Sequence, residues 1–189
     1  MSIGLIVLLV VVLVAGWVWI TYNGLVKTKI RADEAFSDIT VQMKRRFDLI
    51  PNLIETVKGY AKHEKSVFEN VTKARTAAMA APEGDAAAMA KADNALSGTL
   101  KSLLAVSENY PDLKANESFQ QLQSELVDTE DKIQASRRFY NGNVRDLNTK
   151  LQVFPTNTIG GMLGFKPREF FDVDAADKAA VEKPVDVKL

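Results

Sequence analysis

Apolar residues recur along most of this chain at the three- and four-residue spacing of helices that bury one face. Around Pro51 these positions are Ile39, Met43 and Phe47 before it, and Leu53, Val57 and Tyr60 or Ala61 after it. Proline removes a backbone donor and disfavours a helical conformation in the residue before it. The pattern therefore predicts a first helix that stops near Phe47 and a second that starts at Pro51, with Asp48 as its N-cap.

The other breaks in the pattern predict two further helices. The second helix fades into small residues, and the turn residues Ala81-Pro82-Glu83-Gly84 follow. Asp85 is then placed to cap a third, alanine-rich helix. A fourth helix begins near Asn116 or Ser118 and ends before Pro155. Its apolar residues keep to the spacing of a coiled-coil or bundle seam, so the chain is predicted to be all-α.

The N-terminal stretch is apolar and long enough to cross a membrane. Residues Ile3 to Ile20 contain no charged side chain, and about 20 helical residues span a hydrocarbon core. Trp17, Trp19 and Tyr22 stand where an interfacial aromatic belt would lie. A cleaved signal peptide is the alternative, but the stretch lacks a basic start, and Val14-Ala15-Gly16 is a poor cleavage site. The pattern favours a membrane anchor.

Basic residues follow this stretch and do not precede it. They are Lys27, Lys29 and Arg31, and further along Lys44, Arg45 and Arg46. Because the cytoplasmic flank of a span carries the excess of Lys and Arg, we expect the N-terminus outside and the rest of the chain in the cytoplasm. The triplet at 44–46 would lie roughly 30 Å from the headgroups on a continuous helix. We therefore expect it to form a solvated face.

The segment after Pro155 combines turn residues with aromatic and basic side chains. These side chains are Phe165, Phe170 and Phe171, with Lys166 and Arg168 between them. In an up-and-down arrangement the fourth helix returns to the membrane side, so we expect the three rings to face lipid at the interface. The alternative is that they cover the end of this bundle or of a neighbouring copy. Residues 174–189 are polar and are predicted to be disordered.

Composition excludes several classes of protein. The 189 residues include 24 basic and 24 acidic ones, and this balance leaves no electrostatic footprint for nucleic acid. The chain has no cysteine, which excludes disulfides, thiolate metal sites and a cysteine nucleophile. No motif for a phosphate loop is found, and we expect no cofactor.

The single histidine, His63, adjoins Glu64 and is the first candidate for metal or acid/base chemistry. Neighbouring helical residues point about 100° apart, so the two cannot chelate together. The Glu-x-x-His spacing of di-iron bundles would require a glutamate at position 60, where Tyr60 stands. We therefore expect neither a catalytic nor a metal site here.

Arg137 lies on the apolar seam of the fourth helix. Glu64 or Glu130 could be its partner inside the protein, and a buried ion pair that fixes the register of the helices is our first interpretation. The alternative is an enzyme, or the regulatory subunit of one, with a polar pocket formed by Glu64, Arg137 and Tyr140.

Several of these segments together resemble the LemA family of bacterial membrane proteins. The similar segments are Tyr22 to Val26, Val41 to Leu53, Gly59 to Glu64, Ser136 to Asn141 with Val144 and Asn148, Phe154-Pro155, and Phe165 with Phe170-Phe171. The resemblance covers most of residues 1–171. It implies an N-terminal transmembrane helix followed by an up-and-down antiparallel four-helix bundle. It implies no reaction, catalytic residue or cofactor.

These observations predict three parts and a structural role. The parts are a transmembrane anchor at residues 1–24, a four-helix bundle at 25–155 and a tail at 156–189. We expect a single-pass protein of the bacterial inner membrane that self-associates or scaffolds other envelope proteins. Its expected partners are membrane lipid, further copies of the chain or other membrane proteins. The expected interface residues are Trp17, Trp19, Tyr22, Lys27, Lys29, Arg31, Phe165, Phe170 and Phe171.

Overall fold

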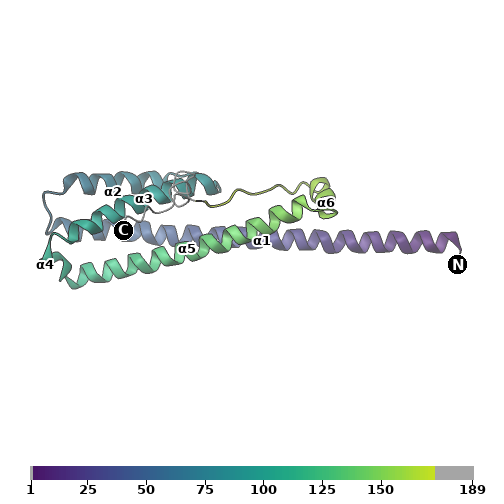
Figure 1. Ribbon diagram of the computed structural model, residues 1–189, viewed down its shortest axis with the longest axis horizontal. Helices are drawn as coiled ribbons and strands as arrows, with labels where there is room; N and C mark the ends of the chain where they lie inside the picture. The colour runs from purple at the N-terminus through teal and green to yellow at the C-terminus, as the bar shows by residue number, and fades with distance from the viewer. Residues whose placement is uncertain (1, 173–189) are drawn as a thin grey trace, which may run out of the picture. The chain divides into compact units, whose positions relative to one another are not determined.

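The computed structural model describes residues 2–172, which form helices and the segments that connect them (Figure 1). The helices are α1 (Ile3–Lys58), α2 (Lys65–Met79), α3 (Ala86–Ser107), α4 (Pro111–Lys114), α5 (Glu117–Gln152) and α6 (Thr156–Met162). No strand occurs in this part of the chain, which confirms the all-helical prediction. The predicted disordered segment, residues 174–189, lies outside the described residues.

The long helix α1 passes through Pro51 without a break, so the predicted helix end near Phe47 is wrong. Asp48 lies inside α1 and is not an N-cap. The chain turns instead at residues 59–64, and α2 starts at Lys65. Pro51 is exposed, whereas the residues around it on the opposite face are buried in a core. Burial of that face outweighs the local cost of a proline, which is about 3 kcal/mol in a helix interior.

The predicted N-cap of the third helix is confirmed, and the fourth predicted helix begins near Asn116, one of the two starts that the sequence offers. The side chain of Asp85 accepts a hydrogen bond from the backbone N–H of Ala88 at 2.8 Å, at the start of α3. The side chain of Asn116 accepts one from the N–H of Phe119 at 2.9 Å, at the start of α5. Each bond satisfies a donor that the first turn of a helix leaves without a partner.

The chain divides into two units with their own internal contacts. Among the described residues, the larger unit comprises Ile39–Ser136 and residues 169–172, and the smaller comprises residues 2–38 and Arg137–Arg168. Helices α1 and α5 therefore contribute residues to both units.

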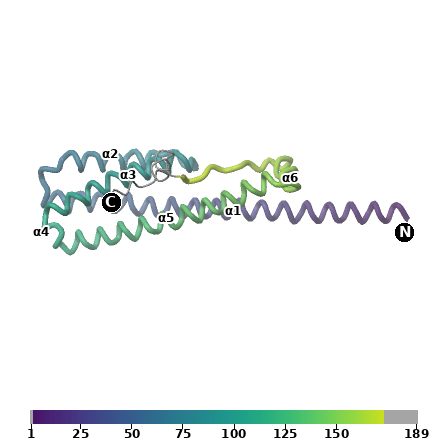
Figure 2. Tube along the Cα trace, in the orientation of Figure 1, coloured from purple at the N-terminus to yellow at the C-terminus, as the bar shows by residue number. Residues whose placement is uncertain are grey.

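In the larger unit, the end of α1, α2, α3 and the start of α5 share one apolar core. Its buried residues include Ile50, Leu53, Val57, Phe68, Val71, Leu96, Leu100, Leu103, Phe119 and Leu126. Arg75 of α2 donates to the backbone carbonyl of Phe47 at 2.8 Å, so α2 runs back along α1 from the turn at 59–64. Asn116 bonds to Tyr60 at 3.1 Å. Figure 2 shows α4 in the connection between α3 and α5.

In the smaller unit, the start of α1 packs with the end of α5 and with α6. Lys150 of α5 donates to the hydroxyl of Thr28 on α1 at 2.7 Å. The side chain of Asn148 holds the backbone of Arg168 with two hydrogen bonds, accepting from its N–H at 2.9 Å and donating to its carbonyl at 2.8 Å. The sequence predicts only a loop where α6 forms.

The first turns of α1 leave their apolar side chains uncovered. Residues 2–20 are all exposed, and an 18-residue window of α1 reaches a mean hydropathy of 3.0 with none of it buried. Leu25 is the first fully buried residue of the helix. By length and composition α1 can cross a membrane.

Candidate functional site: a buried arginine cluster

Arg46 of α1 is fully buried in the larger unit. It follows Met43 by three residues and precedes Ile50 by four, and both of these residues belong to the buried face of α1. Ile39, Met43, Arg46 and Ile50 therefore form one regular seam, with a guanidinium where an aliphatic side chain is expected. That spacing is the signal in the sequence from which the burial of Arg46 could have been predicted.

The guanidinium of Arg46 joins three helices. Its Nη2 group forms an ion pair with the carboxylate of Asp93 on α3. Its Nη1 group donates to Oε2 of Glu130 on α5 at 2.5 Å and to the hydroxyl of Ser97 on α3 at 3.1 Å. Asp93 is also fully buried, whereas the side chain of Glu130 is 32% exposed.

This arrangement is suited to holding helices in register. Removing ions from water costs several kcal/mol each, so a buried ion pair adds little net stability, but breaking one by removing a partner is strongly destabilising. A guanidinium keeps its proton in proteins and therefore cannot act in proton transfer. In the cluster of Arg46, Asp93 and Glu130, one fixed positive charge on α1 meets carboxylates from both α3 and α5.

The prediction that residues 44–46 form a solvated face is wrong for Arg46. Lys44 and Arg45 are exposed as predicted. Consecutive helical residues point about 100° apart, so three in a row cannot share one face. Arg46 is the one of the three that falls on the seam of Met43 and Ile50 and therefore enters the core.

Arg45 takes part in a separate, exposed network with α5. Its guanidinium lies 3.8 Å from the carboxylate of Asp128, which also accepts a bond from Lys132 at 2.7 Å. The hydrogen bond from Lys132 lowers the pKa of Asp128, and the charges of Lys132 and Arg45 act in the same direction. Such exposed pairs contribute little to stability.

The residues of the predicted polar core, Glu64, Arg137 and Tyr140, are divided between the two units. Glu64 precedes α2 in the larger unit, and its side chain makes no capping hydrogen bond. Arg137 and Tyr140 belong to the smaller unit, where the buried ring of Tyr140 lies 5.5 Å from that of Phe36. A buried ion pair does occur in the larger unit, but between Arg46 and Asp93, which were not predicted to form one.

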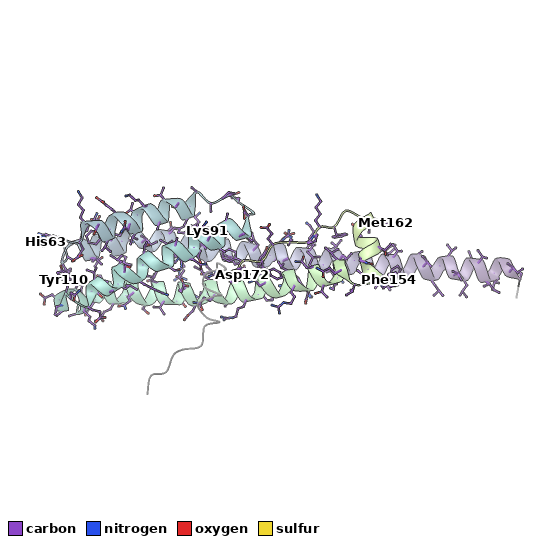
Figure 3. The ribbon with its side chains drawn as sticks, turned by 45° about the horizontal axis from the view of Figure 1, so that its top comes forward. His63, Lys91, Tyr110, Phe154, Met162 and Asp172 are labelled. Atoms are coloured by element: carbon purple, nitrogen blue, oxygen red, sulfur yellow. The ribbon has the colours of Figure 1, made fainter. Side chains whose placement is uncertain are left out.

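The lone histidine lies at one end of the larger unit. His63 is exposed in the connection between α1 and α2, near the same end as Tyr110 (Figure 3). Among residues 2–172 no group of three or more His, Asp or Glu side chains is placed to hold a metal ion.

The residues predicted to lie at the membrane interface differ in how exposed they are. Those on α1, namely Trp17, Trp19, Tyr22, Lys27, Lys29 and Arg31, are exposed. Phe165 is partly buried, and its ring packs edge-on against Tyr22 at 6.2 Å. Phe170 is exposed in the larger unit, but Phe171 is only 1% exposed. The expectation that Phe171 faces lipid is therefore wrong, because protein covers its ring.

These features define a class, that of all-helical proteins with an apolar N-terminal helix able to enter a membrane. Residues 35–188 match the LemA family, and the chain belongs to this family, as the resemblance predicts.

Three relatives show the range of proteins to which the chain is similar. Magnetosome protein MamQ 2 of Paramagnetospirillum magneticum is 25% identical, over 87% of this chain and 68% of its own. Magnetosome protein MamQ of Magnetospirillum gryphiswaldense is 24% identical with the same coverage. Protein LemA of Metamycoplasma hominis is 24% identical, over 85% of this chain and 73% of its own.

Proposed function

We propose that this chain is a single-pass scaffold of the bacterial inner membrane, with its N-terminus outside and its helical core in the cytoplasm. One observation carries the proposal: the helix that supplies the core of the larger unit begins with uncovered apolar residues. Exposing such a run to water is unfavourable, whereas a membrane accepts it without cost. The exposed bases Lys27, Lys29 and Arg31 follow the run and support the orientation.

We infer that the helices of the larger unit form an up-and-down antiparallel four-helix bundle. The bond from Arg75 to Phe47 supports an antiparallel α1 and α2, and the bonds of Tyr60 with Asn116 and of Arg46 with Glu130 support an antiparallel α1 and α5. The cluster around Arg46 supports a unique register for this bundle.

Self-association, or association with other envelope proteins, is the molecular role that we propose for the bundle. Val41 of α1 and Val127 of α5 are large apolar side chains that the larger unit leaves exposed. The alternative, an enzyme or regulatory subunit with a pocket formed by Glu64, Arg137 and Tyr140, has less support because these residues belong to different units.

Cysteine accessibility in intact cells tests the topology, since the chain has no cysteine of its own. The variant Glu83→Cys places a thiol in the exposed turn before α3, next to Gly84, whose positive φ of 85° makes Gly84 itself a poor site. We expect Glu83→Cys to resist a membrane-impermeant reagent until the cells are permeabilised, and Ser2→Cys to react at once. Reaction of Glu83→Cys in intact cells would contradict the proposal. The mass of the detergent-extracted protein, with its co-purifying chains identified, tests association.

A further inference from the structure

The smaller unit carries a second apolar surface, separate from the exposed run of α1. It lies where α5 passes into α6 and where α6 ends (Figure 3). Phe154 and Met162 are each 83% exposed, and Val153 and Leu163 are about half exposed. Several large apolar side chains exposed within one short stretch of a unit are typical of an interaction surface.

This surface lies beside the part of α1 where the uncovered apolar run ends. The ring of Phe165, which follows α6, packs on Tyr22. A Cβ added to Gly160 of α6 would lie 3.8 Å from the side chain of Leu25, so α6 itself is close to that turn of α1. Both contacts are with the turns that directly follow the exposed apolar residues of α1. These contacts place α6 and the segment after it beside the turns of α1 that follow the exposed apolar run.

A pocket of about 400 Å³ adjoins this surface within the smaller unit. Its basic lining residues are Lys29, Lys166 and Arg168, and its apolar ones include Leu147, Leu163 and Phe165. The carboxylate of Asp33 lies 3.3 Å from the ammonium of Lys29 and also pairs with Arg168. Lys29, Lys166 and Arg168 carry three positive charges and Asp33 carries one negative charge. The edge of the pocket formed by these residues, called the rim below, is therefore positive. The two hydrogen bonds between the side chain of Asn148 and the backbone of Arg168 hold the rim in place.

We propose that this pocket binds the phosphate of an anionic phospholipid in the leaflet that α1 enters, while Phe154, Met162 and Leu163 insert among its acyl chains. Cationic groups above apolar side chains match an anionic headgroup above its chains. A second copy of the chain is a poorer occupant, because two identical surfaces would bring two positive rims together. The inference rests on the proposed membrane anchoring and adds a lipid-selective contact that the anchor does not require.

Site-specific fluorophores in nanodiscs test the proposal with the full-length chain. Single cysteines at Met162, at Val10 in the span and at Glu83 in the exposed turn before α3 carry an NBD label. The nanodiscs contain equal amounts of phosphatidylcholine and phosphatidylglycerol, with a nitroxide quencher on the acyl chain of one or the other. We expect lipid quenching at Val10 and Met162 and none at Glu83. At Met162 alone, quenching by labelled phosphatidylglycerol should exceed that by labelled phosphatidylcholine.

Variants that change one charge test whether the pocket binds the lipid headgroup, independently of whether the apolar side chains insert into the bilayer. Lys166→Gln should reduce the preference for phosphatidylglycerol at Met162 roughly fivefold, the effect of one basic residue at an anionic surface. Asp33→Asn, which removes the acidic group from the rim, should increase the preference. Arg145→Gln, an exposed charge on α5 in the same unit, is the matched control and should leave it unchanged. Circular dichroism confirms that each variant is folded.

Each outcome distinguishes this inference from the anchoring on which it rests. Absence of quenching at Val10 overturns the anchoring. Quenching at Val10 but not at Met162 overturns only the present inference, and self-quenching between labelled copies at Met162 would identify a second copy as the occupant. Equal quenching at Met162 by labelled phosphatidylcholine and labelled phosphatidylglycerol would contradict the proposal that the pocket selects an anionic headgroup. Loss of the preference on adding inorganic phosphate identifies free phosphate as the ligand instead of lipid.

Discussion

The guanidinium of Arg75 donates a hydrogen bond to the backbone carbonyl of Phe47, the carbonyl that Pro51 leaves without its helical donor. In an α-helix the N–H of residue 51 would bond to that oxygen, but proline has no N–H. The Nε atom of Arg75 on α2 lies 2.8 Å from it. A side chain from the neighbouring helix thus replaces the missing bond and allows α1 to continue to Lys58.

We expect Arg75→Ala to lower the free energy of unfolding by about 1 to 2 kcal/mol, because it leaves this carbonyl without a donor. In a Pro51→Ala background the helix supplies its own donor, so the same change should cost clearly less. Unfolding of the four proteins of this double-mutant cycle, followed by circular dichroism in one detergent, measures the difference. An equal cost of Arg75→Ala in both backgrounds would show that the two residues are not coupled.

We expect Arg46→Ala to destabilise the larger unit by roughly 3 to 5 kcal/mol, because it leaves the buried carboxylate of Asp93 uncompensated. The double change Arg46→Leu with Asp93→Leu should recover most of this loss. Arg45→Ala is the matched control, and as one member of an exposed pair it should cost less than about 1 kcal/mol. Chemical denaturation measures all three variants.

Two results would contradict this role for Arg46. One is a cost of Arg46→Ala no larger than that of Arg45→Ala. The other is a double variant whose loss equals the sum of the separate Arg46→Leu and Asp93→Leu losses, since partners in one buried pair are not additive.

We expect NMR titration to place the pKa of Asp128 below the ordinary value of an aspartate. Lys132→Ala should raise it more than Arg45→Ala does, because the hydrogen bond from Lys132 is the largest cause of the lowering. A lowered carboxyl pKa contributes stability that is present above the unfolded-state value of about 4 and is lost as the pH falls through the folded-state value. A larger change in the Arg45 variant would mean that charge across the helices dominates.

We expect Asn148→Ala to release the segment that follows α6. Its two bonds to the backbone of Arg168 are lost, and amide exchange at Arg168 should accelerate roughly tenfold, the effect of one lost hydrogen bond. Asn143→Ala is the control on the same helix, because Asn143 bonds only to its own helix at the carbonyl of Phe139. Hydrogen exchange read by mass spectrometry compares them, and unchanged exchange in the Asn148 variant would show that other contacts hold the segment.

Local chemistry explains which parts of the fold are predictable from the sequence. The caps at Asp85 and Asn116 follow from a short polar side chain directly before a helix, and both partners of each bond lie within one turn. The end of α1 is not predictable in this way. The donor that compensates for Pro51 comes from Arg75 on another helix, so no local pattern around the proline contains it.

In the candidate site, the burial of Arg46 is predictable from nearby residues, but its partners are not. The seam of Ile39, Met43, Arg46 and Ile50 is visible in the sequence, and it places an arginine in the core. Its partners lie on α3 and α5, and nothing in the spacing near Arg46 selects Asp93 or Glu130. Arg137 also lies on an apolar seam, so the spacing alone does not single out Arg46.

The two acidic partners of Arg46 are synthesised one after the other, because a chain is made from its N-terminus and Asp93 precedes Glu130. Asp93 on α3 is synthesised before α5, so a partner that can neutralise Arg46 is present before Glu130 is made. Glu130 arrives last with a side chain that stays 32% exposed, so water still hydrates the second negative charge as α5 docks. The nascent chain therefore need not bury an unbalanced charge at any stage, although the finished cluster holds two carboxylates and one guanidinium.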